Sequence, residues 1–504
     1  MKKFIKFIAL VLVLCTIFAT LCACGGGEEE ESSTADVSKV DVLFSGLPDV
    51  NYGDEEFVIL VPGDDYTTYM SEEIMPQATT PQVLADNIID RNDLVESTFG
   101  VKITEVRTAN NSTEDMIAIL RAANEAGLDD YDLAMPYIPE AATLALEDSF
   151  YLLNDLEYID LSKDCWDENA TSGLSIRNKN YFATGDISLL SLACTHAIVF
   201  NKDMITEYGL ENPYDLVSNG EWTLDKLREM AKEVTNDSDG TVGMGYKDHY
   251  GFLVNSNYTT SMFVGAGENL TIKNANDEPV IAVNSESAVS TFSKIFDLVN
   301  DTTATGKIDD TAGGYYTSAV NAGLTCWDAA TESVANKKAL FRSMAIIDII
   351  DLGEYECNFG ILPTPKLNKE QDDYYSFVST LYATCIAIPS SLSAEAAERS
   401  SVIAQALCEA STDTTKNAYY EIVLKKRKIQ DVESEAMLDY IFSSRVYDIG
   451  VVFSWGGESI YDTNGIGQFL NTIAYSGNET FASTYESIKD VIQADIDETL
   501  EKFE

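Results

Sequence analysis

The chain alternates between continuous apolar runs and segments in which apolar residues recur every three or four positions. Residues 57–61 are apolar throughout and are followed by Pro62 and Gly63, a pattern typical of a parallel strand buried on both faces. A helical pattern begins after Pro81 and ends at Gly100, a residue type that favours the left-handed conformation found at helix ends. These residues predict a buried strand followed by an amphipathic helix.

The alternation continues through two more strands. Residues 101–106 have the pattern of a strand, and Met116, Leu120 and Ala123 mark one side of a second helix. Residues 131–135 form another short apolar run. Because strand, helix, strand, helix, strand is the order of a doubly wound unit, we predict an α/β fold that begins with parallel strands.

A second set of elements follows. Residues 197–200 read as a strand, and Thr223 can cap a helix that carries apolar residues on one face. Long apolar or alternating runs cover residues 340–350 and 377–389, and residues 433–503 have a mostly helical pattern. No repeat of 20–50 residues is visible in the sequence, which argues against solenoids and propellers.

The first residues predict an export signal. Three lysines lie among the first six residues, and an apolar run follows at residues 7–14 that is too short for a comfortable membrane span. Residues 21–24 (LCAC) resemble a bacterial lipobox, in which the last cysteine is lipidated. We therefore predict a signal peptide over residues 1–23 and a lipid, such as palmitate, on Cys24; the alternative is an ordinary signal peptide cut nearby.

Residues 24–50 begin with glycines and a run of glutamates, which predicts a flexible acidic tether. Later stretches do not approach 18 consecutive apolar residues, so we expect contact with the membrane through the lipid anchor only. The sequence therefore predicts a protein held at the outer face of the cytoplasmic membrane.

Composition narrows the function. The chain has 504 residues, with 33 basic and 83 acidic residues and a formal charge of −50. Such a charge repels phosphate backbones, which excludes nucleic acid as a partner. A hydrophobic fraction of 45% supplies large cores, and the length suggests two or more folding units, because single cores stop growing at roughly 250–300 residues. Two histidines leave little for a histidine-rich metal site.

The remaining chemistry-bearing residues give weak signals. Six cysteines follow Cys24; none forms a CxxC pair and their 15 possible pairings stay open, although we favour free thiols. Residues 236–240 (NDSDG) resemble part of a calcium loop, but its first and last positions would be Thr235 and Tyr246, so we predict a polar turn without metal. GxSxG, HExxH and Walker A motifs are absent from the sequence, and we predict no cofactor and no enzyme activity.

Four segments together resemble a known family. Residues 197–203 (AIVFNKD), 222–227 (WTLDKL), 337–341 (KKALF) and 359–366 (FGILPTPK) are similar, in this order, to stretches of the bacterial extracellular solute-binding proteins of family 1. These are the sugar-binding lipoproteins of ABC importers and are related to maltose-binding protein. Lys337 stands where the family usually has glycine. The resemblance covers most of the mature chain.

The resemblance implies a two-lobe α/β fold, of the type II periplasmic-binding-protein kind, with hinge strands, a helical C-terminal region and a ligand cleft between the lobes. Applied to this chain, lobe one would span residues 50–190 and 385–432, and lobe two residues 191–384 and 433–504. It also implies a monomer that delivers its solute to the permease subunits of an ABC transporter.

The resemblance further implies ligand-binding positions. Asp64, Asp65 and Tyr66 follow the first strand in a loop that matches a ligand-facing loop of the family. Tyr137 follows the third strand at the same rim, and Asp186 precedes the crossing into lobe two. Carboxylates can accept hydrogen bonds from sugar hydroxyls, whereas the alternative for each aspartate is a solvated turn.

Two aromatic residues complete the predicted site. Tyr258 and Trp455 match positions where the family has cleft aromatics, whose flat apolar surfaces suit the C–H face of a sugar ring. The alternative for both is packing in the core. We therefore expect a lipid-anchored carbohydrate receptor of an ABC importer. A secreted carbohydrate-active hydrolase and a receptor for a non-sugar solute such as a peptide stay open as alternatives.

Overall fold

The structure is a computed structural model that describes residues 42–63, 67–109, 113–353, 355–425, 432–459 and 462–504. The chain divides into two units between Ser45 and Gly46, and the unit Gly46–Glu504 is the one described below. The predicted lipid site Cys24 and the predicted ligand residues Asp64, Asp65 and Tyr66 lie outside the described residues. No helix among those that are described is long and apolar enough to cross a bilayer.

The first sheet has the order β2-β1-β3 with all strands parallel. Its strands are β1 (Glu55–Val61), β2 (Val101–Arg107) and β3 (Leu133–Ala134), and the helices between them are α3 (Gln82–Phe99) and α4 (Thr113–Ala126). This confirms the predicted alternation of strands and helices. Gly100 has φ 60°, so its missing side chain permits the turn from α3 into β2.

A distant segment continues this sheet. Residues 383–389 run antiparallel beside β3 and form single bridges, Ala134 with Ala387 and Ala183 with Ile386. The run predicted at 377–389 is thus divided between two halves of the unit. Its first part belongs to a short strand, β11 (Ser376–Phe377), and its last part lies against the first sheet.

The second sheet has five strands in the order β10-β4-β9-β5-β8. They are β4 (His196–Asn201), β5 (Tyr250–Val254), β8 (Thr305–Lys307), β9 (Ala339–Ala345) and β10 (Phe359–Leu362). Strand β5 is parallel to β8 and β9, whereas β4 is antiparallel to both of its neighbours. The amino end of β4 therefore lies at the same edge as the carboxyl ends of β5 and β9.

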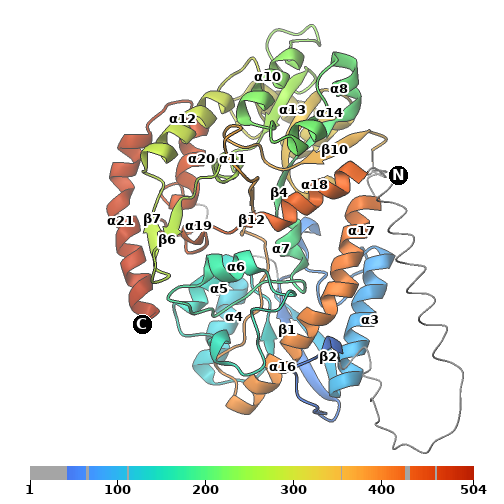
Figure 1. Cartoon of the computed structure of the whole chain (residues 1–504), viewed down its shortest axis with the longest axis vertical. Coiled ribbons are helices and arrows are strands. Elements are labelled where there is room, and N and C mark those ends of the chain that lie inside the picture. The colour runs from blue at the N-terminus through green and yellow to red at the C-terminus, as the bar shows by residue number, and fades with distance from the viewer. Residues whose placement is uncertain (1–41, 64–66, 110–112, 354, 426–431, 460–461) are drawn as a thin grey trace, which may run out of the picture. The chain divides into compact units, whose positions relative to one another are not determined.

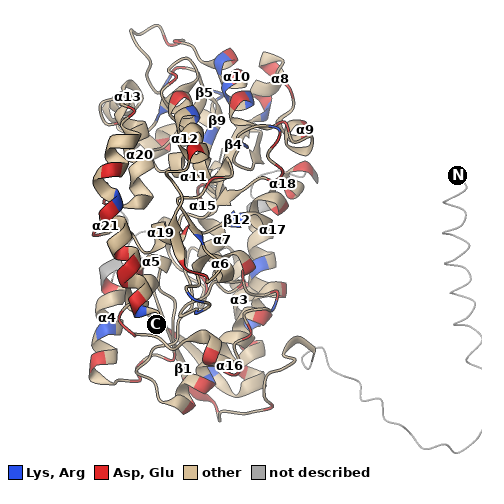
Figure 2. Ribbon diagram, turned by 60° about the vertical axis from the view of Figure 1, so that its left-hand side comes forward, with Lys and Arg blue, Asp and Glu red and all other residues tan. Residues whose placement is uncertain are grey.

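Helices cover both sheets, and they surround the two sheets separately in Figure 1. Helix α10 (Leu224–Val234) packs on β5 and begins at Thr223, whose side chain accepts a hydrogen bond from the Lys226 amide, as the sequence predicted. Helix α16 (Ala394–Ser411) packs on α3, and α18 (Val432–Ser443) packs on β10. Figure 2 marks acidic and basic residues along the ribbon, and both kinds lie on the outer helices.

The run 340–350 is not one element, because the chain turns at the sheet edge. Strand β9 ends at Ala345 and α15 (Ile346–Leu352) begins at once, with the Asp348 carboxylate accepting a hydrogen bond from the Ala345 amide at 3.2 Å. An apolar run alone does not distinguish a buried strand from a buried helix.

Within the described residues, the chain passes between the sheets at α7 (Leu189–Ala193), which leads into β4, and in the stretch after β11. Helix α17 (Asn417–Lys425) packs against both α3 and α15. The exact lobe boundaries stay a prediction.

The remaining helices and strands complete the unit, and the C-terminal part is mostly helical, as predicted. They are η1 (Thr67–Tyr69), α5 (Ile138–Ala145), η2 (Leu153–Asp155), α6 (Glu168–Leu174), α8 (Lys202–Tyr208), α9 (Pro213–Ser218), α11 (Tyr258–Gly265), β6 (Thr271–Lys273), β7 (Pro279–Ile281), α12 (Glu286–Val299), α13 (Gly314–Asn321), α14 (Cys326–Ala335), the π-helical turn η3 (Thr412–Lys416), β12 (Arg445–Val446), α19 (Ile449–Val452), α20 (Ile466–Ser476) and α21 (Phe481–Lys502).

Candidate functional site

The second sheet gathers polar residues at the edge where β5 and β9 end. His196 begins β4 and pairs with Ala345 at the end of β9, and Asn257 follows the end of β5. Ligands of open α/β sheets bind beyond the carboxyl ends of strands. We therefore expect a ligand site at this edge.

A small cavity of about 50 Å³ lies at this edge. We call it the histidine chamber. It receives residues from β4, α11, the crossing segment after β11, and α20, and its lining includes no Asp or Glu among the described residues. Its polar members are His196, Asn257, Thr260, Ser379, Thr380, Gln468 and Asn471.

Two buried polar atoms of the histidine chamber have no partner. The Nδ1 atom of His196 and the hydroxyl of Thr380 find no hydrogen bond among the described residues, and the residues are only 7% and 1% exposed. Buried polar groups are almost always hydrogen-bonded, so each exception needs a reason. A ligand or an ordered water in the chamber would supply the missing bonds.

The His196 imidazole is held between aromatic rings. It stacks on Tyr258 with ring centroids 5.1 Å apart and meets the edge of Phe377 at 5.8 Å. Burial lowers the pKa of His196 to about 4, because the charged form loses its hydration. The ring is therefore neutral at physiological pH and offers one acceptor and one donor nitrogen.

Asn471 fixes the opposite wall. Its side-chain oxygen accepts hydrogen bonds from the backbone amide of Thr260 at 3.0 Å and from the Thr260 hydroxyl at 3.1 Å. This joins the first turn of α11 to α20. Asn257 and Gln468, which lie near these helix starts, keep side chains that are not fully buried.

A larger cavity of about 440 Å³ lies where β1 and β9 end. We call it the loop cavity, because the loop between β1 and α3 forms one wall and α7, α15 and α17 form the others. Residues that line it include Glu72, Glu73, Leu190, Ala193, Ile347 and Tyr419.

Glu73 ties the β1–α3 loop to both crossing segments. Its Oε1 accepts hydrogen bonds from the Leu190 amide at 3.0 Å and from the Thr384 hydroxyl at 2.5 Å, and its Oε2 accepts one from Ser71 at 2.9 Å. Burial raises the pKa of Glu73, and these hydrogen bonds act in the opposite direction. The carboxylate thus positions the loop relative to the hinge.

Three tyrosines lie between the two cavities. Tyr69 stacks on Tyr382 at 4.3 Å, and Tyr137 meets the edge of Tyr382 at 5.4 Å. Tyr69 adjoins residues of the loop cavity, and Tyr382 follows Leu381 of the histidine chamber. The buried Tyr137 hydroxyl has no partner among the described residues. We call the loop cavity, these tyrosines and the histidine chamber together the crevice.

Two predicted site residues belong to or adjoin this crevice. Tyr137 lies directly after β3, as the sequence predicted, and is one of the three tyrosines between the two cavities. Tyr258 is fully buried, and its hydroxyl bonds to the Ala197 carbonyl at 2.9 Å and to the Thr364 hydroxyl at 3.1 Å. It supports the His196 ring from behind. The ligand-binding role of both residues stays a prediction.

Trp455 and Asp186 lie elsewhere. The Trp455 ring is 2% exposed, stacks on Phe453 at 5.7 Å and donates from Nε1 to the Thr499 hydroxyl at 2.9 Å, which favours the core alternative. The Asp186 carboxylate is paired with Lys416 at 2.8 Å and accepts a hydrogen bond from Thr412 at 2.7 Å. Neither residue lines the crevice described above.

Sequence reasoning missed the residues that line the histidine chamber. His196 is the first residue of β4, one position before the strand predicted at residues 197–200, and Thr380 lies in a run that has the pattern of an ordinary strand. The only available signal was a histidine at the start of an apolar strand in a chain with two histidines. Asn471 gives no local signal, because its role depends on the packing of α20 against α11.

Three carboxylates gather in the stretch considered for calcium. Asp237, Asp239 and Asp248 approach one another closely enough to share an ion. However, Asp248 accepts hydrogen bonds from three backbone amides, those of Ser238 at 2.6 Å, Asp239 at 2.9 Å and Gly245 at 2.8 Å. These amides take three of the roughly four acceptor positions of the Asp248 carboxylate, so this side chain holds the turn together, and the absence of a metal stays a prediction.

No family model matches the sequence, and no curated protein matches it. The structure is similar to solved structures of binding proteins. A cyclo/maltodextrin-binding protein complexed with maltotetraose has a TM-score of 0.55 at 14% identity over 88% of this chain and 97% of that one. The maltose-binding periplasmic protein MalE from Listeria monocytogenes, in complex with maltose, has a TM-score of 0.54 at 14% identity over 88% and 98%.

UgpB from Mycobacterium tuberculosis, in complex with glycerophosphocholine, has a TM-score of 0.54 at 13% identity over 88% of this chain and 98% of that one. The chain therefore has the two-lobe α/β fold of periplasmic binding proteins, as the sequence predicted. The crevice receives residues from the segments that follow β1, β5 and β9, so both sheets contribute to it.

Proposed function

We propose that this chain is an extracellular solute-binding receptor that captures a carbohydrate in the crevice and delivers it to the permease of an ABC importer. A lipid on Cys24 would hold it at the outer face of the cytoplasmic membrane. One observation carries the proposal: in a solute-binding fold, the crevice contains buried, neutral polar atoms without partners, at His196, Thr380 and Tyr137.

Neutral donors and acceptors beside aromatic rings suit a sugar. Hydroxyls of a sugar can satisfy the open positions of His196 and Thr380, and the tyrosine group offers flat apolar surfaces for its C–H face. The described lining of the histidine chamber has no charged residue, so a neutral ligand can form hydrogen bonds there at little electrostatic cost. The mechanism is differential affinity, because a solute that touches both lobes favours their closed arrangement.

The volume of the histidine chamber adds a requirement. A space of about 50 Å³ holds only one or two waters and is far below the 300–1,000 Å³ typical of ligand pockets. A sugar that uses the chamber must therefore widen it. The lobes would part around the crossing segments before the solute enters and close again around it.

Titration calorimetry with a panel of mono- and oligosaccharides tests the proposal. Thr380→Val removes one unpartnered hydroxyl and keeps the shape, so it should weaken binding of the active sugar about tenfold. Thr184→Val is the matched control, since Thr184 is equally buried, also lacks a side-chain partner among the described residues and lies outside the crevice cavities. Absence of heat from all sugars, with clear heat from peptides or amino acids, would reject the carbohydrate assignment.

A receptor for a non-sugar solute is the second candidate. The structurally similar UgpB was solved with glycerophosphocholine, so this fold also accommodates other solutes. A hydrolase has less support, because glycoside hydrolysis needs two carboxylates across the bond. The described lining of the histidine chamber has none, and Glu73 of the loop cavity already accepts three hydrogen bonds from the protein. Release of a chromophore from nitrophenyl glycosides would favour the hydrolase.

A further inference from the structure

Two cavities lie away from the crevice, beside α17 and α18. One has a volume of about 560 Å³ and the other about 540 Å³, and both are lined by Tyr440, Ser443 and Arg445. We call them the flank cavities. Because they share three residues, a ligand of several rings can extend from one into the other. Each volume is within the range of small-molecule sites.

Helix α7 separates the flank cavities from the crevice. Leu192 lines the first flank cavity, whereas Leu190 and Ala193 of the same helix line the loop cavity. Neighbouring residues of α17 divide in the same way, with Tyr420 on the flank and Tyr419 on the loop cavity. The flank cavities are therefore a separate place on the molecule.

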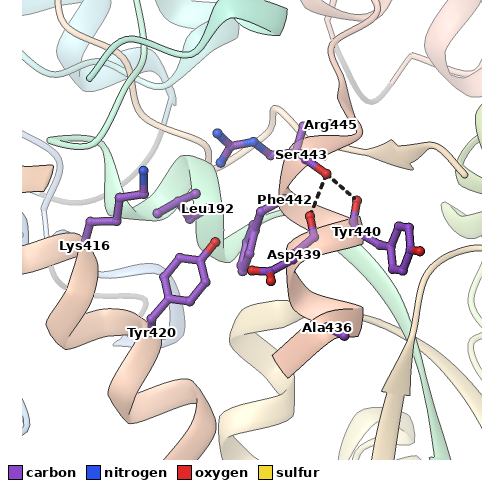
Figure 3. A pocket seen from close by; sticks show the side chains of 9 residues that line it. All are labelled: Leu192, Lys416, Tyr420, Ala436, Asp439, Tyr440, Phe442, Ser443 and Arg445. Atoms are coloured by element: carbon purple, nitrogen blue, oxygen red, sulfur yellow. Dashed lines mark hydrogen bonds between the residues drawn. The ribbon is translucent and has the colours of Figure 1, made fainter. Parts of the chain in front are cut away.

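Aromatic rings form much of the flank surface. Tyr420 lies 5.0 Å from Phe442, and Tyr440 lies 6.2 Å from Tyr374, measured between ring centroids. Tyr440 is 45% exposed, so part of its ring is open to a ligand. Figure 3 shows Tyr420 and Lys416 on one side of the first cavity and Phe442, Asp439 and Arg445 on the other.

The cations of the first cavity are already paired. Lys416 contacts Asp186 at 2.8 Å, and Arg445 contacts Asp167 at 2.8 Å. The Nε atom of Arg445 is buried and has no hydrogen-bond partner among the described residues. The paired cations keep N–H groups that can donate to a ligand, but their charges are compensated.

Asp439 is the remaining charged residue of this lining. Its carboxylate is exposed and forms no ion pair within the described part of the chain. It repels an anion, and its oxygen atoms can accept hydrogen bonds from the hydroxyl groups of a ligand. Aromatic faces, N–H donors and carboxylate acceptors, which Asp372 and Asp373 also supply in the second cavity, are the groups that recognise neutral polyols.

Both lobes contribute to the second cavity. Asn169 of α6 comes from the first lobe, and Ser218 of α9 comes from the second. Asn169 also donates a hydrogen bond to the Ser443 carbonyl at 3.3 Å, which brings α6 against the end of α18. We infer that the flank cavities form a second saccharide site, distinct from the crevice and able to hold an oligosaccharide along α18.

Saturation-transfer NMR with defined probes tests this inference. The probes are maltotriose, cellotriose, xylotriose and raffinose, with citrate and spermidine as charged comparisons. Tyr440→Ala and Asp439→Ala should weaken flank binding of at least one trisaccharide about tenfold. Tyr208→Ala is the matched control, because Tyr208 is 38% exposed and lies outside the cavities described here.

Asn257→Trp separates the two sites, because Asn257 is an exposed crevice residue and a tryptophan there fills the histidine chamber. Saccharide binding that survives Asn257→Trp and is lost in Tyr440→Ala supports the flank site, even if the crevice binds no sugar. Binding abolished by Asn257→Trp and unchanged in Tyr440→Ala overturns it. A saturation-transfer signal from citrate or spermidine alone, or from none of the probes, also overturns the inference.

Discussion

The crevice and the flank cavities use buried polar groups in opposite ways. In the crevice, the buried atoms of His196, Thr380 and Tyr137 are neutral and lack partners. In the flank, Arg445 is charged and paired with Asp167 at 2.8 Å. A neutral atom left unpaired costs little enough for the fold to tolerate, and a ligand can recover that cost. A buried charge must be paired for the fold to persist.

Mutations in the crevice and mutations in the flank cavities should therefore have different effects on affinity and stability. Crevice residues should govern affinity with small effects on stability, because their open positions become satisfied only on binding. The paired flank residues should govern stability, because their partners come from elements far apart in the sequence. Each prediction below tests one side of this division.

Asp167→Ala should have the largest effect. Its Oδ2 forms an ion pair with the Arg445 guanidinium at 2.8 Å and accepts a hydrogen bond from the Tyr447 hydroxyl at 2.8 Å, and its Oδ1 caps α6. Removal leaves a buried guanidinium without its counter-charge, so we expect the free energy of unfolding to fall by about 3–5 kcal/mol. Urea unfolding followed by circular dichroism measures this change.

The control for Asp167→Ala is Glu147→Ala. Glu147 pairs with Arg121 at 2.7 Å, but both side chains are more than one-third exposed, so the expected change is within about 0.5 kcal/mol. Equal effects of the two substitutions would show that burial of the flank pair has no special role, and the division between the regions would be lost.

His196→Phe should change the pH dependence of stability. The folded-state pKa of about 4 lies below the value of about 6.5 in an unfolded chain, so the unfolded state binds more protons between these values. Stability therefore falls as pH decreases from 6.5 to 4, by up to about 3 kcal/mol for this one group. Phenylalanine keeps the stacking on Tyr258 and removes the titration.

Unfolding free energies of the wild type and His196→Phe at pH 4, 5, 6 and 7 measure the difference. The only other histidine in the sequence is His249, whose pKa is also lowered, mainly by burial. The variant His249→Gln therefore serves as the comparison. Parallel pH curves for wild type and His196→Phe would mean that the imidazole is not buried in neutral form. A flattened curve together with weaker sugar binding would place His196 in the ligand site.

Local patterns were sufficient for the first lobe. Residues 57–61 lie in β1, and α3 ends at Gly100, as predicted. Both signals are local, because a continuous apolar run and a helix-ending glycine affect only the residues next to them. The split of residues 340–350 between β9 and α15 was not visible, because both parts are equally apolar. The spacing of apolar residues predicts which residues are buried. Where a strand ends depends on its neighbouring strands, which the local sequence does not reveal.

The candidate site was less predictable for the same reason. His196 faces the crevice only because β4 runs antiparallel to β9, which brings its first residue to the edge where β9 ends. Thr380 reaches the same edge from a segment more than 180 residues later. Pairings over such separations leave no mark in the local sequence, whereas Tyr137 was found because it directly follows β3.

Trp455→Phe tests whether this tryptophan belongs to either region. The ring packs on Phe453, and its Nε1–H donates to the Thr499 hydroxyl at 2.9 Å. Phenylalanine removes that hydrogen bond and part of the ring volume, so we expect a loss of about 1–2 kcal/mol in unfolding free energy. Sugar affinity should stay within about twofold of the wild type, because Trp455 lines neither the crevice nor the flank cavities.

Trp222→Phe is the matched comparison for that substitution, since Trp222 is also fully buried and donates its Nε1–H, in this case to the Pro363 carbonyl at 2.9 Å. Both variants should lose similar stability and keep the affinity measured by calorimetry. If Trp455→Phe instead weakens binding tenfold at unchanged stability, Trp455 reaches the solute when the lobes open. The crevice would then extend toward α21, and neutral polar atoms alone would not define it.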